Sequence, residues 1–134
     1  MNPFDSGTMV ARYAAGRPYH HGRTVRRALG DRRYDRALDL ACGTGLSTRA
    51  LAERGTAVVG VDVVPAMVAW ARRTTGLPYA VGSAEALPVA DRSVDLVAVS
   101  SGVHWFAAGP VAAEAARVLR PGGALLLYEY AGAQ

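Results

Sequence analysis

The sequence lacks several features that mark whole classes of protein. It has one cysteine, Cys42, so no internal disulfide can form and a disulfide-stapled fold is excluded. No apolar run approaches the roughly 18–20 residues that span a bilayer, and the first residues lack the basic and apolar stretches of a secretory signal. Lysine and isoleucine are absent, which we attribute to the codon usage of a GC-rich genome. These absences predict a soluble, cytoplasmic protein.

The residues that are present indicate one globular domain. The chain has 134 residues, of which 51% are hydrophobic and 19% are charged. Domains usually have about 100–200 residues, and this apolar content excludes a disordered chain. We therefore expect a single domain over residues 1–134, with a core from residue 36 onward.

The positive charge is concentrated near the start of the chain. The net charge is +4, and residues 1–36 carry eight arginines against three aspartates. The other 98 residues carry seven arginines against eight acids. The basic segment has three interpretations: a solvated helix face, a guide for an anionic small substrate, or a nucleic-acid contact. The last is disfavoured because no aromatic residues are interleaved as in a nucleic-acid platform, and we expect neither nucleic acid nor membrane as a partner.

Beyond Arg36 the sequence alternates between strand-like and helix-like segments. The expected strands are Ala37–Ala41, Thr56–Val61, Pro78–Val81, Val94–Val99 and Ala124–Tyr130, and the expected helices are Leu46–Arg54, Val64–Thr75 and Pro110–Leu119. This alternation predicts an α/β fold: a doubly wound, mainly parallel sheet with helices on both faces. Residues 1–35 are expected to form one or two helices, interrupted at Gly16 and Gly22, over the ligand-binding edge of the sheet.

The clearest motif runs from Asp39 to Ser47 and reads DLACGTGLS. A buried strand leads into a turn with two glycines, and a helix follows. Glycines allow a tight turn and leave room for a ligand against the backbone, while the helix start directs unpaired N–H groups to the same place. Asp39 is placed to accept a hydrogen bond from a cationic amino group. The alternative is an ordinary surface turn that contains Gly43 and Gly45.

A second acidic residue, Asp62, ends the second predicted strand, nineteen positions after Gly43. An acid at this place typically accepts hydrogen bonds from both hydroxyls of an adenosine ribose, although it could instead cap the next helix. Together the glycine turn and Asp62 predict an adenosine-containing cofactor. A dinucleotide fingerprint has glycine where this chain has Thr48, so an NAD-dependent oxidoreductase is a lesser alternative.

Four motifs, in order over about residues 36–130, resemble those of class I S-adenosylmethionine-dependent methyltransferases. Residues 39–45, DLACGTG, are similar to the first motif of that family. Residues 82–97, GSAEALPVADRSVDLV, resemble the family pattern GDAExLPFxDxSFDLV, and residues 117–123, RVLRPGG, resemble the motif before its fifth strand. The small-molecule "type 11" branch, with trans-aconitate and quinone-biosynthesis methyltransferases, is the most similar. The resemblance implies a Rossmann-like fold, S-adenosyl-L-methionine as cofactor, and direct displacement of a methyl group onto a small-molecule acceptor.

The resemblance also implies roles for single residues. Ala41, Gly43 and Gly45 would line the methionine part of the cofactor, with Asp39 near its ammonium group. Asp62 would hold the ribose hydroxyls.

Further residues would surround the adenine and the reacting groups. Val63 would pack on the adenine, and Ala84 and Glu85 would meet its edge. Ser83 stands where the family often has aspartate, so Glu85 or the backbone would take over that contact. Ser100, at the end of the fourth strand, would lie beside the sulfonium.

The remaining candidates lie in the leading segment and in the loop after the fourth strand. Tyr13 and Arg17 would fold over the cofactor, with Arg17 pairing with its carboxylate. His104 would act as a general base or contact the substrate, and Trp105 would form a wall of the substrate pocket. We expect an unreactive Cys42 and no metal site.

The family sheet has seven strands, whereas this chain ends after the fifth. We therefore expect it to lack the antiparallel hairpin of the family and to expose its fifth strand as an edge, through which a second copy could pair. A catalytically inactive cofactor-binding remnant that serves as a partner or regulatory subunit is the main alternative to an active methyltransferase.

Overall fold

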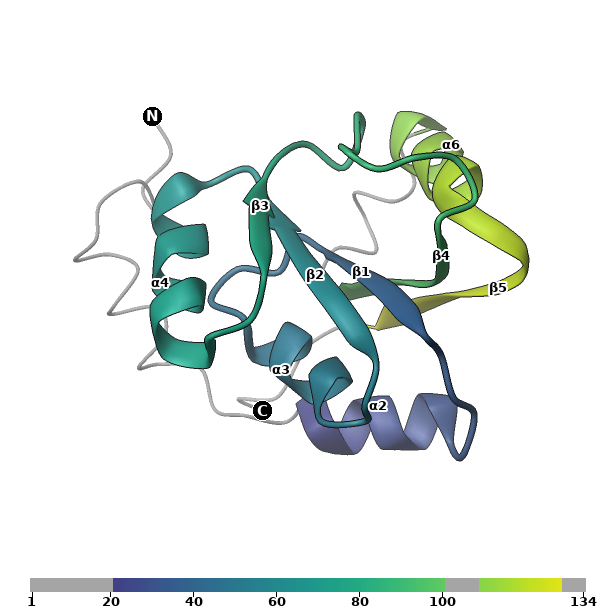
Figure 1. Cartoon of the computed structure of the whole chain (residues 1–134), viewed down its shortest axis with the longest axis horizontal. Helices are drawn as coiled ribbons and strands as arrows, with labels where there is room; N and C mark the ends of the chain where they lie inside the picture. The colour runs from purple at the N-terminus through teal and green to yellow at the C-terminus, as the bar shows by residue number, and fades with distance from the viewer. Residues whose placement is uncertain (1–20, 101–108, 129–134) are drawn as a thin grey trace.

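The computed structural model describes residues 21–100 and 109–128, which form an open sheet with helices on both faces (Figure 1). Five strands lie in the order β3-β2-β1-β4-β5, and every neighbouring pair is parallel. The strands are β1 (Arg36–Leu40), β2 (Ala57–Asp62), β3 (Tyr79–Val81), β4 (Val94–Ser100) and β5 (Leu119–Tyr128). The predicted doubly wound α/β fold is confirmed, and the strand order reverses beside β1 as expected.

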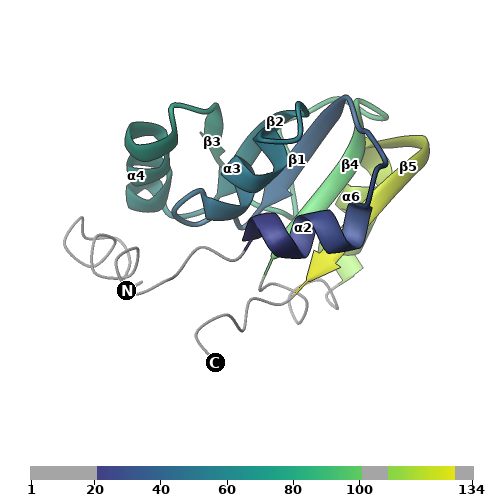
Figure 2. The same ribbon diagram turned by 90° about the horizontal axis from the view of Figure 1, so that it is seen from below.

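The helices of the described residues cover the two faces of the sheet unequally (Figure 2). One face carries α2 (His21–Leu29), α3 (Leu46–Ala52) and α4 (Pro65–Thr75), and the other carries α6 (Gly109–Val118). On the first face Val25 and Leu51 share a buried cluster with Ala37 of β1. On the second face Val118 packs in a cluster with Leu38. Because successive strand residues point to opposite faces, neighbours in β1 belong to different clusters.

The segment before β1 differs from the prediction in two ways. Gly22 was expected to interrupt a helix, but it lies inside α2, next to its first residue, where glycine costs less stability than in the middle of a helix. The described part of the segment was also expected over the ligand-binding edge. Instead α2 packs beside α3 on the face of the sheet, since its apolar residues Val25 and Leu29 are buried there. Residues 1–20 of the predicted cap lie outside the described residues.

The connection from β3 to β4 is a helix-free stretch over residues 82–93. Among the described residues, no helix covers the part of the second sheet face beside β2 and β3. At the other end of the sheet β5 begins at Leu119 rather than at Ala124, because the stretch 120–123 enters the strand through an irregularity in its pairing with β4. None of the helices among the described residues is long and apolar enough to cross a membrane.

Candidate cofactor site

The glycine turn and the ends of β1 and β2 form one structural unit at the carboxyl edge of the sheet. The backbone N–H of Cys42 donates to the carbonyl of Val61 at 3.1 Å, and the N–H of Gly43 donates to Oδ2 of Asp62 at 2.9 Å. The other carboxylate oxygen, Oδ1, accepts from the N–H of Val64 at 2.9 Å. Asp62 does not cap α4, whose N-cap residue is Val64 without a side-chain cap bond; its bond to the N–H of Val64 lies in the turn before the helix. Each oxygen keeps a second acceptor site for a ligand hydroxyl.

Asp39 lies beneath the turn and is fully buried. Its Oδ2 accepts hydrogen bonds from the hydroxyls of Ser47 at 2.6 Å and Thr48 at 2.7 Å, both in α3. Its Oδ1 is buried and meets no hydrogen-bond donor from the described residues. Burial raises the pKa of Asp39 from 3.8 to about 6, against the lowering effect of the two hydroxyls and with a further increase from the nearby charge of Asp62. A buried, half-satisfied carboxylate therefore sits directly below the turn.

The two glycines of the turn serve different purposes. Gly43 has φ 55°, and a Cβ added there would meet nothing within 4 Å, so its backbone faces open space. Gly45 has φ 93°, but a Cβ there would lie 2.6 Å from the hydroxyl of Tyr79 and 3.1 Å from Cβ of Ala71. Gly43 thus leaves room for a ligand, whereas Gly45 leaves room for the protein itself.

Two other residues of the turn have unusual backbone or side-chain environments. Ala41 has φ 55°, in the left-handed region that favours glycine, so the end of β1 holds a strained backbone. Cys42 is buried, and desolvation raises the pKa of its thiol far above the usual range. The thiol is consequently a poor nucleophile, in agreement with the prediction that Cys42 is unreactive.

The residues predicted around the adenine occupy the ends of β2 and β3. The side chain of Val63 is 51% exposed although it is apolar, and it directly follows Asp62. Ala84 is half-buried and packs against the second core cluster, while Glu85 is exposed. The hydroxyl of Ser83 accepts a hydrogen bond from the N–H of Glu85 at 3.0 Å and so stabilises the local turn.

Several predicted residues cannot be placed in this geometry. Tyr13, Arg17, His104 and Trp105 lie outside the described residues. Ser100 ends β4 beside β1, as expected, but its side chain lies outside the described part of the structure.

Sequence reasoning missed the residues that hold the site together. Ser47 and Thr48 hydrogen-bond Asp39, and Tyr79 packs over Gly45 while its hydroxyl pairs with Thr75 Oγ1 at 2.7 Å. The available signal for the first pair was two hydroxyl residues in the first turn of the helix after the glycines, eight and nine positions after Asp39.

A second missed group fixes the connection between β3 and β4 to α6. The guanidinium of Arg117 donates to the carbonyls of Leu87 and Val89 at 3.0 and 2.9 Å and to the carboxylate of Asp91 at 2.7 Å. Glu114 accepts from Arg117 at 2.7 Å and from the N–H of Leu87 at 2.6 Å. These hydrogen bonds lower the pKa of Glu114 from 4.5 to about 2.

A parallel sheet with a glycine turn after its first strand and an acid ending its second defines a class, the Rossmann-like cofactor-binding domains. The chain belongs to the Methyltransferase domain family, whose match covers residues 38–127. The family resemblance predicted from the sequence motifs is therefore confirmed.

Individual relatives agree with this assignment. An uncharacterized methyltransferase of Mycobacterium tuberculosis is 42% identical over 122 residues, which cover 89% of this chain and 49% of that protein. A demethylmenaquinone methyltransferase of Beutenbergia cavernae is 43% identical over 105 residues, 77% of this chain and 44% of the relative. The chain thus spans about half the length of the curated relatives it matches.

Solved structures show the same fold. The PH0226 protein of Pyrococcus horikoshii has a TM-score of 0.70 at 32% identity, with 80% of this chain and 54% of that chain covered. A TehB-like SAM-dependent methyltransferase of Corynebacterium glutamicum has a TM-score of 0.73 at 24% identity, with coverage of 94% and 73%.

Proposed function

We propose that this domain binds S-adenosyl-L-methionine at the carboxyl edge of its sheet and transfers the methyl group to a small-molecule acceptor. One observation carries the proposal: in a chain of the methyltransferase domain family, the open backbone of Gly43 is hydrogen-bonded to the carboxylate of Asp62 at 2.9 Å. This bond puts the glycine turn and the acid that ends β2 side by side, so one ligand can contact both.

The residues at this edge fit the proposed cofactor. Gly43 offers free space against the backbone, and Asp62 retains an acceptor site on each oxygen. Val63 offers an exposed apolar surface next to Asp62, suited to an aromatic base. The unpartnered Oδ1 of Asp39 leaves an uncompensated negative charge under the turn, which favours a cation above it.

The sulfonium cofactor supplies a methyl group that is already electrophilic, so the protein chiefly has to orient the reactants and exclude water. Asp62 would bind the ribose hydroxyls, and the backbone around Gly43 would accommodate the amino-acid part. The carboxylate of Asp39 is buried and accepts hydrogen bonds from Ser47 and Thr48. Its negative charge would therefore attract the ammonium group of the cofactor across the turn and not by direct contact. Where the acceptor must lose a proton, we propose His104 as the base, with Trp105 against the substrate.

The acceptor is proposed to be anionic because arginines dominate the first 36 residues. Within α2, however, Arg23, Arg26 and Arg27 are exposed on the helix surface, which fits the solvated-face interpretation. Support for an anionic acceptor therefore rests on the arginines that precede His21. Three of the matching relatives are named demethylmenaquinone methyltransferases, so a quinone-like acceptor is the second class to test.

Calorimetric titration tests the cofactor first, with S-adenosylmethionine, S-adenosylhomocysteine and NAD as parallel ligands. We expect micromolar binding of the first two and none of NAD. Asp62→Ala should abolish binding, whereas Asp31→Ala, which removes an exposed acid far from the turn, should not. Thermal unfolding of both variants separates a lost ligand contact from a lost fold, because Asp62 also holds two backbone N–H groups.

Methyl transfer is tested separately, by release of S-adenosylhomocysteine in the presence of small carboxylates and of quinols. Turnover of either class supports an enzyme. Tight cofactor binding with no turnover by any acceptor would instead favour the inactive partner subunit.

A further inference from the structure

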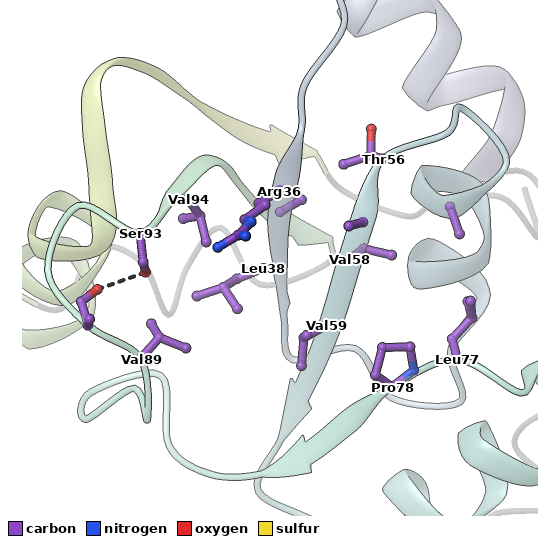
Figure 3. A pocket seen from close by; sticks show the side chains of 14 residues that line it. Arg36, Leu38, Thr56, Val58, Val59, Leu77, Pro78, Val89, Ser93 and Val94 are labelled. Carbon is purple, nitrogen blue, oxygen red and sulfur yellow. Dashed lines mark hydrogen bonds between the residues drawn. The ribbon is translucent and has the colours of Figure 1, made fainter.

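A cavity lies at the amino ends of the strands, whereas the proposed cofactor site lies at their carboxyl ends (Figure 3). It is formed at the amino ends of β1, β2 and β4 and by the residues just before β3, and its volume is about 670 Å³. We call it the amino-end groove; its lining includes Arg36, Leu38, Val59, Pro78, Val89 and Val94. Cavities of this size are typical of small-molecule sites.

The walls of the amino-end groove are apolar. Figure 3 shows Val89 and Val94 on one side and Pro78 on the other, with Leu38 and Val59 between them. The single hydroxyl on the valine side, that of Ser93, already donates to the carbonyl of Ala90 at 2.7 Å. An aliphatic chain would therefore meet hydrocarbon over most of the groove.

The groove is open for two reasons that the sequence makes visible. The connection over residues 82–93 contains no helix that could cover this part of the sheet. In the family pattern that this connection resembles, phenylalanine occupies two positions at which this chain has Val89 and Val94. Both valines line the groove, and the valine side chain is smaller than that of phenylalanine.

One charged side chain enters this apolar space. Arg36 is the sole charged residue among the 14 that line the groove, and its guanidinium extends between Leu38 and Val94 (Figure 3). No carboxylate of the described residues pairs with this guanidinium. The carboxylate of Asp95, on the neighbouring strand β4, accepts instead from the backbone N–H groups of Asp35 and Arg36 at 2.8 Å. A guanidinium that has no carboxylate partner among residues 21–100 and 109–128, and that lies above hydrocarbon, complements a carboxylate with an apolar body.

We propose that the amino-end groove binds a medium-chain aliphatic carboxylate, with its chain against Leu38, Val59 and Val89 and its carboxylate at Arg36. This site is independent of the proposed cofactor site, because the two lie at opposite ends of the same strands. Its ligand is recognised by charge at one end and by apolar area along the rest.

The test uses decanoate as the probe and decyltrimethylammonium, which has the same chain with the opposite charge, as the matched control. Both are titrated below their micelle concentrations into the ¹⁵N-labelled full chain and followed by amide chemical shifts. We expect decanoate to shift the amides of Leu38, Val59 and Val94, and to bind at least fivefold more tightly than the cation. Arg36→Gln should weaken decanoate binding at least fivefold, whereas Arg23→Gln, which removes an exposed arginine on α2, should leave it unchanged.

Two filling variants, Val89→Phe and Val59→Phe, probe the apolar part independently. Each should reduce decanoate binding at least fivefold. A variant that keeps the wild-type pattern of amide signals is folded, so the result is taken from such a variant. Titration of Asp62→Ala with decanoate should give the wild-type affinity, which separates this proposal from the one for the cofactor. Equal binding of the two probes, shifts confined to other surfaces, or full binding to a folded filling variant would overturn the proposal. The proposal would also be overturned if a second copy of the chain closes the groove. In that case the chain would be a dimer, Val89→Phe would dissociate it, and decanoate would not bind in the groove.

Discussion

The buried carboxylate of Asp39 makes the stability of this domain depend on pH in an unusual direction. Burial raises its pKa from 3.8 to about 6, so the folded state binds the proton more tightly than the unfolded state does. The contribution of this group to stability is therefore fully present below the unfolded pKa and is lost as the pH rises through 6. Asp39→Asn, which keeps the shape and an oxygen acceptor for Ser47 and Thr48, removes this dependence.

The size of the effect follows from the shift. A difference of about two pKa units corresponds to roughly 3 kcal/mol, since one unit is about 1.4 kcal/mol. Between pH 4 and pH 8 the wild-type chain should therefore lose roughly 2–3 kcal/mol of unfolding free energy relative to Asp39→Asn. A constant offset between the two proteins, from the changed hydrogen bonds of the amide, does not alter this difference of differences.

Urea denaturation followed by circular dichroism at pH 4, 5, 6, 7 and 8 measures the difference directly. Asp31→Asn, a substitution of an exposed acid, serves as the control and should follow the wild-type curve. A wild-type chain and an Asp39→Asn variant whose stabilities run parallel across this range would refute the argument. In that case the unpartnered Oδ1 must be solvated or paired in solution.

Three further results are expected. Gly45→Ala should destabilise the domain by roughly 2–5 kcal/mol, because the added Cβ would lie 2.6 Å from the hydroxyl of Tyr79 and the φ of this residue is positive. Gly43→Ala also has a positive φ but faces open space, so it should cost only roughly 1–2 kcal/mol. Thermal unfolding compares the two variants, and equal losses of stability would contradict the roles assigned to the two glycines. The pKa of Glu114 is about 2 in the folded chain against 4.5 when unfolded, so its carboxylate stabilises the fold above pH 4.5 and loses this effect as the pH falls toward 2. Glu114→Gln should therefore reduce the fall in melting temperature between pH 4.5 and pH 2. An equally steep fall in the variant would count against this role of Glu114. If a second copy of the chain pairs with the edge of β5, where the side chain of Leu127 is 39% exposed, sedimentation velocity should detect dimers. Leu127→Lys should remove these dimers. A wild-type chain that is monomeric at every concentration would end that hypothesis.

The parts of the fold that depend on local patterns could be predicted from the sequence. β1 and β2 each lie within one residue of the predicted strand, because a short apolar run bounded by glycine or by a turn is a local signal. The C-terminal cap of α4 is Gly76 with φ 71°, as the glycine after the helical pattern indicates. The hydrogen bond of Asp62 to the glycine turn brings these two motifs together at the carboxyl edge of the sheet.

The parts that depend on tertiary contact could not be predicted. In the sequence, Thr48 is noticed because a dinucleotide fingerprint has glycine at that position. Only the structure shows its role, which is to donate a hydrogen bond from its hydroxyl to Asp39 at 2.7 Å. Gly45 looks like a ligand-facing glycine until Tyr79, 34 residues later, is found against it. A sequence pattern names residues that can turn or bind, whereas their neighbours are set by how helices pack on the sheet.

The contacts of Arg117 also have a consequence for the order in which the chain acquires its structure during synthesis. The guanidinium holds backbone and side-chain oxygens that precede it by 26 to 30 residues, at Leu87, Val89 and Asp91. Until α6 has been made, the connection after β3 lacks these hydrogen bonds, and its remaining contacts are those of Leu87 and its neighbours with β1 and β2. The hydrogen bonds that Arg117 makes to this connection therefore form late in synthesis, and their formation closes a loop of 26 to 30 residues.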